Sequence, residues 1–173
     1  MIKQFRGIYP KFEQVRVQLV TLARMLEINN IHVNSAGQIA IQTNDVDQEG
    51  WHAGVGKSVD RSHTWELQFK DIQRELKDTP VDEYLKWLDV PVYRTRIMLA
   101  REKSSYSIHR DYSPRLHLPL VTNPQALFLF TEPASLHHMP ADGTTYWVDT
   151  RRQHTFINGS TEDRLHLVMI IEE

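Results

Sequence analysis

The chain has 173 residues, no cysteine and a formal net charge of −2, with 40% hydrophobic and 24% charged residues. These values are typical of a globular protein that buries its core without disulfide bonds, and they exclude thiolate metal sites and cysteine nucleophiles. Because the charge is nearly balanced, nucleic acid is not expected as a partner. No apolar run approaches the ~20 residues that span a bilayer, and the first residues lack a signal-peptide core, so we expect a cytoplasmic protein without a membrane partner.

The N-terminal part is expected to be helical and irregular. Apolar residues recur at three- and four-residue steps over residues 10–26, which predicts an amphipathic helix. Residues 39–41 favour a short strand, and a long loop is expected over residues 44–62. The segment 65–77 fits a strand or a helix equally well. A second helix is expected to begin at Thr79-Pro80, with the threonine as N-cap and the proline in the first position.

After Val90 the pattern changes to short β-rich runs, separated by proline, glycine, asparagine and aspartate. These runs are VYRTRIMLA, LHLPLVT, ALFLF, TTYWVD, HTFIN and RLHLVMII. Short strands without intervening helices are typical of an antiparallel sandwich or barrel. We therefore expect a single domain over residues 1–173, mainly β with flanking helices, in which residues 1–90 pack on a β-core formed by residues 91–173.

The sequence does not support two familiar functional motifs. The stretch GVGKSVD suggests a phosphate-binding loop, but Trp51 occupies the position where that motif requires its first glycine. Ser160, His154 and Asp149 supply the residue types of a hydrolase triad, yet no nucleophile elbow surrounds the serine, and Asn-Gly-Ser is typical of a turn.

A different constellation begins with His109-Arg110-Asp111. Residues two apart in an extended chain point to the same face, so His109 and Asp111 can approach one ion while Arg110 points away. Chance alone supplies about one such His-x-acidic match in a chain of this composition. The set gains weight from His154, which opens the run HTFIN, because two imidazoles and one carboxylate form the facial triad of non-haem Fe(II) enzymes.

Arg164 opens the apolar run RLHLVMII, where an unpaired charge would be costly. A guanidinium binds a carboxylate through two parallel charge-assisted hydrogen bonds, which lysine cannot reproduce. Arg164 is thus a candidate anchor for a carboxylate cosubstrate, and a structural ion pair with an aspartate or glutamate is the alternative interpretation.

The C-terminal half resembles the aspartyl/asparaginyl β-hydroxylase family of Fe(II)/2-oxoglutarate dioxygenases, which also contains bacterial enzymes that hydroxylate free proline. The resemblance runs from about Tyr93 to Glu172. Its motifs are HRD (109–111), RLHLPLVTN (115–123), MPADGTTYWVD (139–149), His154, Asn158 and RLHLV (164–168).

The resemblance implies a double-stranded β-helix, or jelly roll, with a cupin-like core. It implies that His109, Asp111 and His154 bind Fe(II), and that Arg164 binds the distal carboxylate of 2-oxoglutarate, the cosubstrate used with O2. Arg115 and His117 belong to the motif that lines the family's pocket, so they are expected to contact the cosubstrate or the substrate.

Further side chains are weaker candidates. Of the adjacent His137 and His138, at most one can face the site, and His138 is the candidate for substrate contact. Arg94 and Arg96 share a strand face, and Arg96 is a second candidate for the substrate. Asp149 is expected to belong to the scaffold or to orient His154.

The expected function is that of a 2-oxoglutarate-dependent hydroxylase acting on a C–H bond of an amino acid or of an Asp/Asn-like side chain, with succinate and CO2 as coproducts. The inward arginines and histidines suggest a small-molecule or peptide substrate that carries an anionic group. Two alternatives remain: a non-catalytic jelly-roll binding module with a structural metal or an anionic ligand, and a cupin-type metalloenzyme, such as an isomerase, that does not use 2-oxoglutarate.

Overall fold

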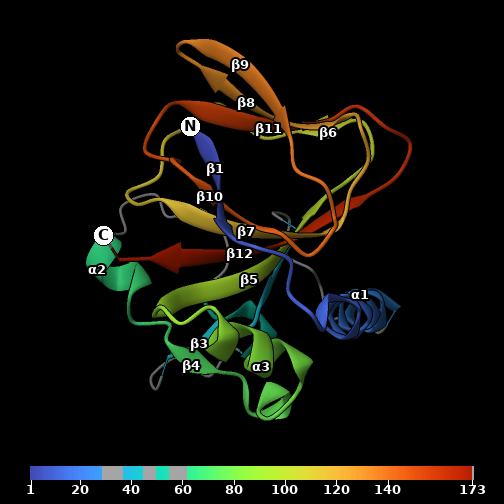
Figure 1. Ribbon diagram of the computed structural model, residues 1–173, viewed down its shortest axis with the longest axis vertical. Coiled ribbons are helices and arrows are strands. Elements are labelled where there is room, and N and C mark those ends of the chain that lie inside the picture. The colour runs from blue at the N-terminus through green and yellow to red at the C-terminus, as the bar shows by residue number, and fades with distance from the viewer. Residues whose placement is uncertain (29–36, 45–49, 55–61, 173) are drawn as a thin grey trace.

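The computed structural model describes residues 1–28, 37–44, 50–54 and 62–172 (Figure 1). Two antiparallel sheets face each other, which confirms a mainly β jelly-roll core with flanking helices. The six-stranded sheet has the order β1 (Ile2–Arg6), β10 (Thr145–Val148), β7 (Arg115–Val121), β12 (Arg164–Ile171), β5 (Val92–Ala100) and β2 (Gln38–Ala40). The four-stranded sheet has the order β6 (Ser104–Ser105), β11 (His154–Asn158), β8 (Ala126–Thr131) and β9 (Ala134–His138).

Helices α1 (Phe12–Ile28) and α3 (Pro80–Trp87) lie on the outer side of the six-stranded sheet, and the short α2 (His63–Glu66) lies near the C-terminal end of β12. The other short elements are the 3-10 turns Gly50–His52 and Arg74–Leu76 and the small sheet of β3 (Gln42–Thr43) and β4 (Asp71–Ile72). Within the described residues, no helix is both long and apolar enough to cross a membrane.

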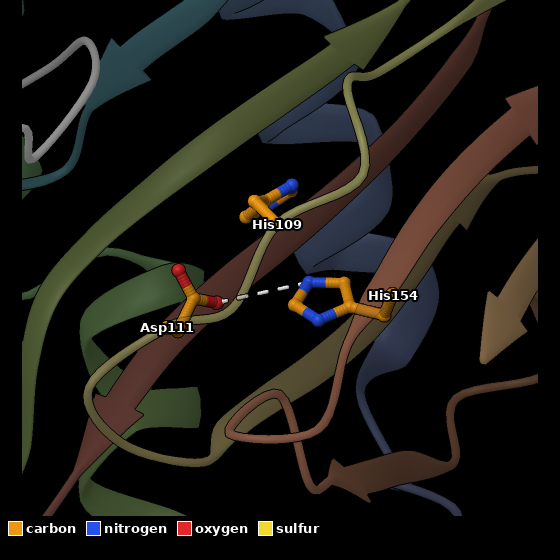
Figure 2. Close-up of side chains that lie close together, drawn as sticks. All are labelled: His109, Asp111 and His154. Atoms are coloured by element: carbon orange, nitrogen blue, oxygen red, sulfur yellow. Dashed lines mark ion pairs between the residues drawn. The ribbon is translucent and has the colours of Figure 1, made fainter. Parts of the chain in front are cut away.

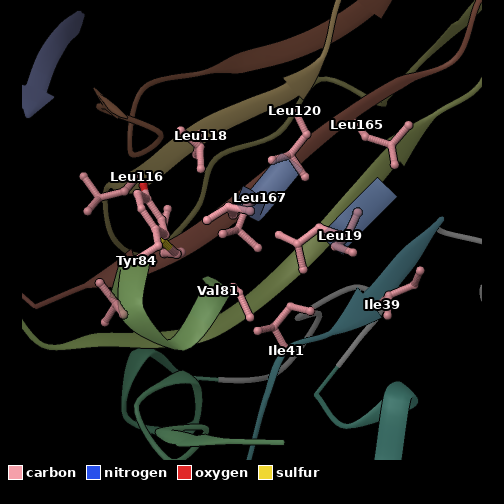
Figure 3. Close-up of a cluster of buried hydrophobic side chains, with 14 of the residues drawn as sticks. Leu19, Ile39, Ile41, Val81, Tyr84, Leu116, Leu118, Leu120, Leu165 and Leu167 are labelled. Carbon is pink, nitrogen blue, oxygen red and sulfur yellow. The ribbon is translucent and has the colours of Figure 1, made fainter. Parts of the chain in front are cut away.

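The main hydrophobic core lies between these helices and the outer face of the six-stranded sheet (Figure 3). Leu116 and Leu118 of β7 and Leu167 of β12 have no exposed surface and pack in one cluster with Leu19 of α1. Each such leucine stabilises the fold by roughly 1.5–3 kcal/mol. Because side chains alternate along a strand, the intervening residues of β7 and β12 point between the two sheets.

The run RLHLVMII shows this division clearly. Its leucines and Met169 belong to the helix-covered core, whereas Arg164 and His166 belong to the inner face. The cross-strand register agrees, since Val168 lies opposite both His117 and Arg96, and opposite residues share a face. The inner face of the larger sheet is therefore polar, although every residue of β12 is buried.

The structure corrects several expectations about local structure. Strands β1, β6 and β9 were not expected, and β1 and β2 bring N-terminal residues into the six-stranded sheet. The segment 65–77 is neither one strand nor one helix, because it contains the end of α2, β4 and a 3-10 turn. Helix α3 begins as expected, with Thr79 in the N-cap position, but the threonine side chain makes no capping hydrogen bond. Gln18 of α1 takes that role, accepting a 3.0 Å hydrogen bond from the Val81 N–H. Most of the loop expected over 44–62, and of GVGKSVD, lies outside the described residues.

Candidate metal centre

The connection between β6 and β7 carries two of the three expected ligands into contact with β11. His109 and His154 form an antiparallel bridge in which each N–H donates to the other residue's carbonyl at 2.9 Å. The Asp111 N–H donates to the Thr150 carbonyl, also at 2.9 Å. Backbone hydrogen bonds thus fix the positions of all three residues independently of their side chains.

The three side chains converge, as Figure 2 shows. One possible ligand atom from each of His109, Asp111 and His154 can be chosen so that all three atoms lie within 4.8 Å of one another. Nε2 of His154 is 3.9 Å from Oδ2 of Asp111, and the two imidazole centroids are 4.4 Å apart. Such spacing fits donors around one ion, and two imidazoles with one carboxylate are a donor set that suits ferrous iron.

Both imidazoles are oriented by backbone carbonyl groups. Nδ1 of His109 lies 2.7 Å from the carbonyl oxygen of Ser107, and Nδ1 of His154 lies 2.8 Å from that of Arg152. A carbonyl oxygen can only accept, so each Nδ1 donates and the lone pair remains on Nε2. His154 also stacks on Phe128 at 4.9 Å, which fixes the plane of its ring. The residues present therefore fit a divalent metal, because both Nε2 atoms keep a lone pair that can coordinate it.

The electrostatic environment lowers the pKa values of Asp111 and His154 and so favours their unprotonated forms. Burial raises the pKa of Asp111, but the opposing charge of Arg115, with smaller contributions from His154 and His109, leaves that pKa below its ordinary value. Burial also lowers the pKa of His154, against the hydrogen bond to Arg152 and the charge of Asp111. Asp111 retains 18% side-chain exposure, and His154 is only 4% exposed.

Polar side chains continue from the triad across the inner face of the six-stranded sheet. Five buried nitrogen atoms on this face have no hydrogen-bond partner in the part of the chain that the structure describes. They are Nε of Arg96, Arg115 and Arg164, and Nε2 of His117 and His166. Buried polar groups are normally satisfied, and such a concentration of orphaned atoms indicates a place built for a polar ligand.

Arg164 is buried without a carboxylate partner among the described residues. Its guanidinium lies 3.8 Å from the centroid of the Phe156 ring and contacts Nδ1 of His166. Burial lowers the pKa of Arg164 to about 9, a sign that its charge is poorly compensated. The structural ion pair considered as the alternative is therefore not formed within the described residues.

Arg115 differs from Arg164 because it has a buried counter-ion. Nη2 of Arg115 donates to the two carboxylate oxygens of Glu66 at 2.9 and 3.2 Å, and lies 3.5 Å from Oδ1 of Asp111. Glu66 was not among the residues expected at the site. Its position between apolar residues in the run TWELQF could have indicated that it is buried. The same carboxylate binds Nη1 of Arg94 at 2.6 Å.

The remaining candidate residues do not all lie at the site. His117 and Arg96 lie on the inner face, as expected. His137 is paired across β8 with Phe128, which faces the site, whereas His138 is paired with Leu127, is exposed and has its hydrogen bond with Thr122. The structure thus does not place His138 beside the triad. Asp149 accepts a hydrogen bond from Nε of Arg151 at 2.7 Å. Its carboxylate therefore stabilises the turn and does not orient His154.

No protein-family model and no curated protein matches the sequence. Among solved structures, the chain is similar to EvdMO1, with 14% identity and a TM-score of 0.54 over 97% of this chain and 46% of that one. It is also similar to apo ThoJ, described as a non-heme monooxygenase, with 9% identity and a TM-score of 0.53 over 96% of this chain and 71% of that one. AviO1 from Streptomyces viridochromogenes has 12% identity and a TM-score of 0.51 over 97% of this chain and 87% of that one. The chain spans about half the length of EvdMO1, and at these identities the likeness shows a common fold.

Proposed function

We propose that this chain is an Fe(II)/2-oxoglutarate-dependent dioxygenase that hydroxylates a C–H bond of an amino acid or of an Asp/Asn-like side chain. One observation carries the proposal: a two-histidine, one-carboxylate donor set and a buried arginine without a carboxylate partner among the described residues border the same space between the two sheets. The donor set suits iron, and the free guanidinium suits the distal carboxylate of a dicarboxylate cosubstrate. The fold shared with a non-heme monooxygenase is compatible with this chemistry.

In this proposal, His109, Asp111 and His154 hold the metal. Bound there, ferrous iron would supply the redox chemistry that couples O2 and 2-oxoglutarate to substrate hydroxylation, giving succinate and CO2. The facial arrangement leaves coordination positions for a cosubstrate. The carbonyl groups of Ser107 and Arg152 hold both imidazoles with Nε2 available as a ligand.

Arg164 would bind the distal carboxylate of 2-oxoglutarate by a bidentate contact. His117, on the neighbouring strand β7, contributes the unpartnered Nε2 to the same inner face. Arg115 is proposed to act on the metal side, where it lies near Asp111 and is held by Glu66. Aromatic rings of Phe128 and Phe156 line the space between the sheets and help to exclude water.

The deciding experiment is an anaerobic titration of the metal-free protein with Fe(II) and then with 2-oxoglutarate. A weak visible absorption band is expected when both are bound, and succinate is expected on admission of O2. Asp111→Ala and His154→Ala should abolish the band, whereas Asp149→Ala, in the turn before His154, should retain it. Iron binding without a band and without succinate would leave the non-catalytic metal-binding module, or a cupin-type enzyme of another class, as the better description.

A further inference from the structure

The charges behind the metal centre form a buried cluster with an uneven balance. Glu66 has no exposed surface, and its carboxylate binds Arg94 at 2.6 Å and Arg115 at 2.9 and 3.2 Å. Arg94 adopts a left-handed backbone conformation, with φ of 45°, beside a β-bulge in the pairing of β5 with β12. Glu66 is thus shared by two guanidinium groups, and Nε of Arg115 has no hydrogen-bond partner among the described residues.

Arg96 lies next to this cluster and has no such partner. It is 7% exposed, its Nε has no hydrogen-bond partner among the described residues, and Nη1 makes one long contact of 3.4 Å with the Arg94 carbonyl. No carboxylate among the described residues lies within 4 Å of Arg96. Burial, followed by the positive charges of Arg94 and Arg115, lowers the pKa of Arg96.

The buried positive and negative charges behind the metal centre do not balance. Within the part of the chain that the structure describes, the guanidinium groups of Arg94, Arg96 and Arg115 lie near two carboxylates, Glu66 and Asp111, which leaves one net positive charge. A divalent metal at Asp111 would add to this excess. An anionic group therefore matches the site, and a planar guanidinium with free donors favours a carboxylate.

The position of Arg96 separates it from Arg164. Arg96 lies opposite Val168 on β12, four residues beyond Arg164 on the same inner face. Four residues of extended chain separate the two backbone positions by about 13 Å, about twice the roughly 6 Å summed over the four carbon–carbon bonds of a five-carbon diacid. Arg96 is also on the side of Arg115 and Asp111, and its charge acts on Asp111.

We propose that Arg96 binds a carboxylate of the primary substrate, at a subsite distinct from the 2-oxoglutarate anchor at Arg164. The proposal rests on the function proposed above and narrows it to substrates that are carboxylic acids. Arg115 contacts the carboxylates of Glu66 and Asp111, whereas Arg96 has no carboxylate within 4 Å among the described residues, so the role falls to Arg96.

A ligand-binding arginine and a structural arginine respond differently to substitution. Removal of a buried charge that has no partner relieves a desolvation cost, so Arg96→Met should melt at the same temperature as the ligand-free wild type or higher. A structural arginine would give a lower melting temperature. Arg96→Lys keeps the charge but not the fork, and should bind a carboxylate with intermediate affinity.

The binding test uses Mn(II) in place of iron and propionate as the probe, with propionamide as its uncharged counterpart. In the presence of saturating 2-oxoglutarate, the wild-type Mn(II) protein should broaden the NMR signals of propionate and not those of propionamide. Arg96→Gln should weaken propionate binding at least about tenfold, as expected for loss of a hydrogen bond to a charged group. It should change the affinity for 2-oxoglutarate less than about twofold. Arg101→Gln, which alters an exposed arginine paired with Asp163 and Glu27, is the matched control.

Three outcomes would overturn the proposal: equal broadening of propionamide, unchanged propionate binding by Arg96→Gln, or equal loss of 2-oxoglutarate and propionate binding. The last would assign Arg96 to the cosubstrate. If Mn(II) or 2-oxoglutarate fails to bind at all, the proposed function fails, and Arg96 is then tested in the metal-free protein. A propionate-dependent rise in the melting temperature that Arg96→Gln abolishes would support the subsite, and no rise in the wild type would refute it.

Discussion

His109 and His154 are joined backbone to backbone, by two reciprocal hydrogen bonds of 2.9 Å, as well as by their converging imidazoles. The bridge needs neither side chain, so His154→Ala should lose the metal while keeping the fold. The loss of a buried ring should lower the free energy of unfolding by about 1–3 kcal/mol. Calorimetric titration with Mn(II) and urea unfolding measure the two effects separately, and retained metal affinity would remove His154 from the ligand set.

Arg164→Lys is expected to weaken 2-oxoglutarate binding by roughly tenfold to a hundredfold, because lysine cannot form the bidentate contact. The Mn(II) affinity should remain that of the wild type, since Arg164 contacts Phe156 and His166 but none of the three ligands. Equal loss of metal and 2-oxoglutarate binding in calorimetry would instead identify a structural arginine.

Glu66→Gln should be strongly destabilising. It leaves Arg94 and Arg115 buried without their counter-ion, and breaking a buried ion pair from one side costs about 3–5 kcal/mol. Glu83→Gln removes an ion pair of similar length, 2.7 Å, from the surface, where such a pair contributes about 0–1 kcal/mol. Urea unfolding of both variants compares the same chemical change in two environments. Similar losses would show that the Glu66 cluster is not effectively buried in solution.

The buried histidines predict an acid limit to stability. Burial, followed by the charge of Arg164, holds the pKa values of His117 and His166 well below 6.5. Because the unfolded chain takes up these protons first, their contribution to the free energy of unfolding is complete above pH 6.5 and is lost as the pH falls toward the folded pKa values. Each histidine gives a slope of up to about 1.4 kcal/mol per pH unit. Urea unfolding between pH 7.5 and 5.5 should show this decline, and His117→Gln with His166→Gln should flatten it. An unchanged slope in the double variant would contradict the assignment.

Strand identity was largely readable from the sequence because it depends on local composition. The runs VYRTRIMLA, HTFIN and RLHLVMII coincide with β5, β11 and β12. In contrast, β1 and β9 are edge strands with exposed residues, so they lack the apolar signal that marks a buried strand.

The metal ligands of the candidate site could be predicted from the sequence, but the buried ion pairs behind them could not. His109, Asp111 and His154 belong to a spacing with a known chemical purpose, and the structure brings them together. The role of Glu66 depends on arginines 28 and 49 positions away, and no local pattern reports such contacts. The pairing of Arg115 with Glu66, and the lack of a carboxylate partner for Arg96 among the described residues, are tertiary properties for the same reason. The resemblance to the aspartyl/asparaginyl β-hydroxylases stays a prediction, since no family model matches.

Strand β12 carries its two tasks on alternate residues, with leucines packed under the helices and Arg164 and His166 directed between the sheets. Insertion of one residue near the start of this strand would exchange the two sets, placing leucines at the cosubstrate anchor and charges in the hydrocarbon core. Substitutions, by contrast, can alter ligand preference on one side of the strand without touching the packing on the other. The architecture therefore tolerates changes of specificity far better than changes of length.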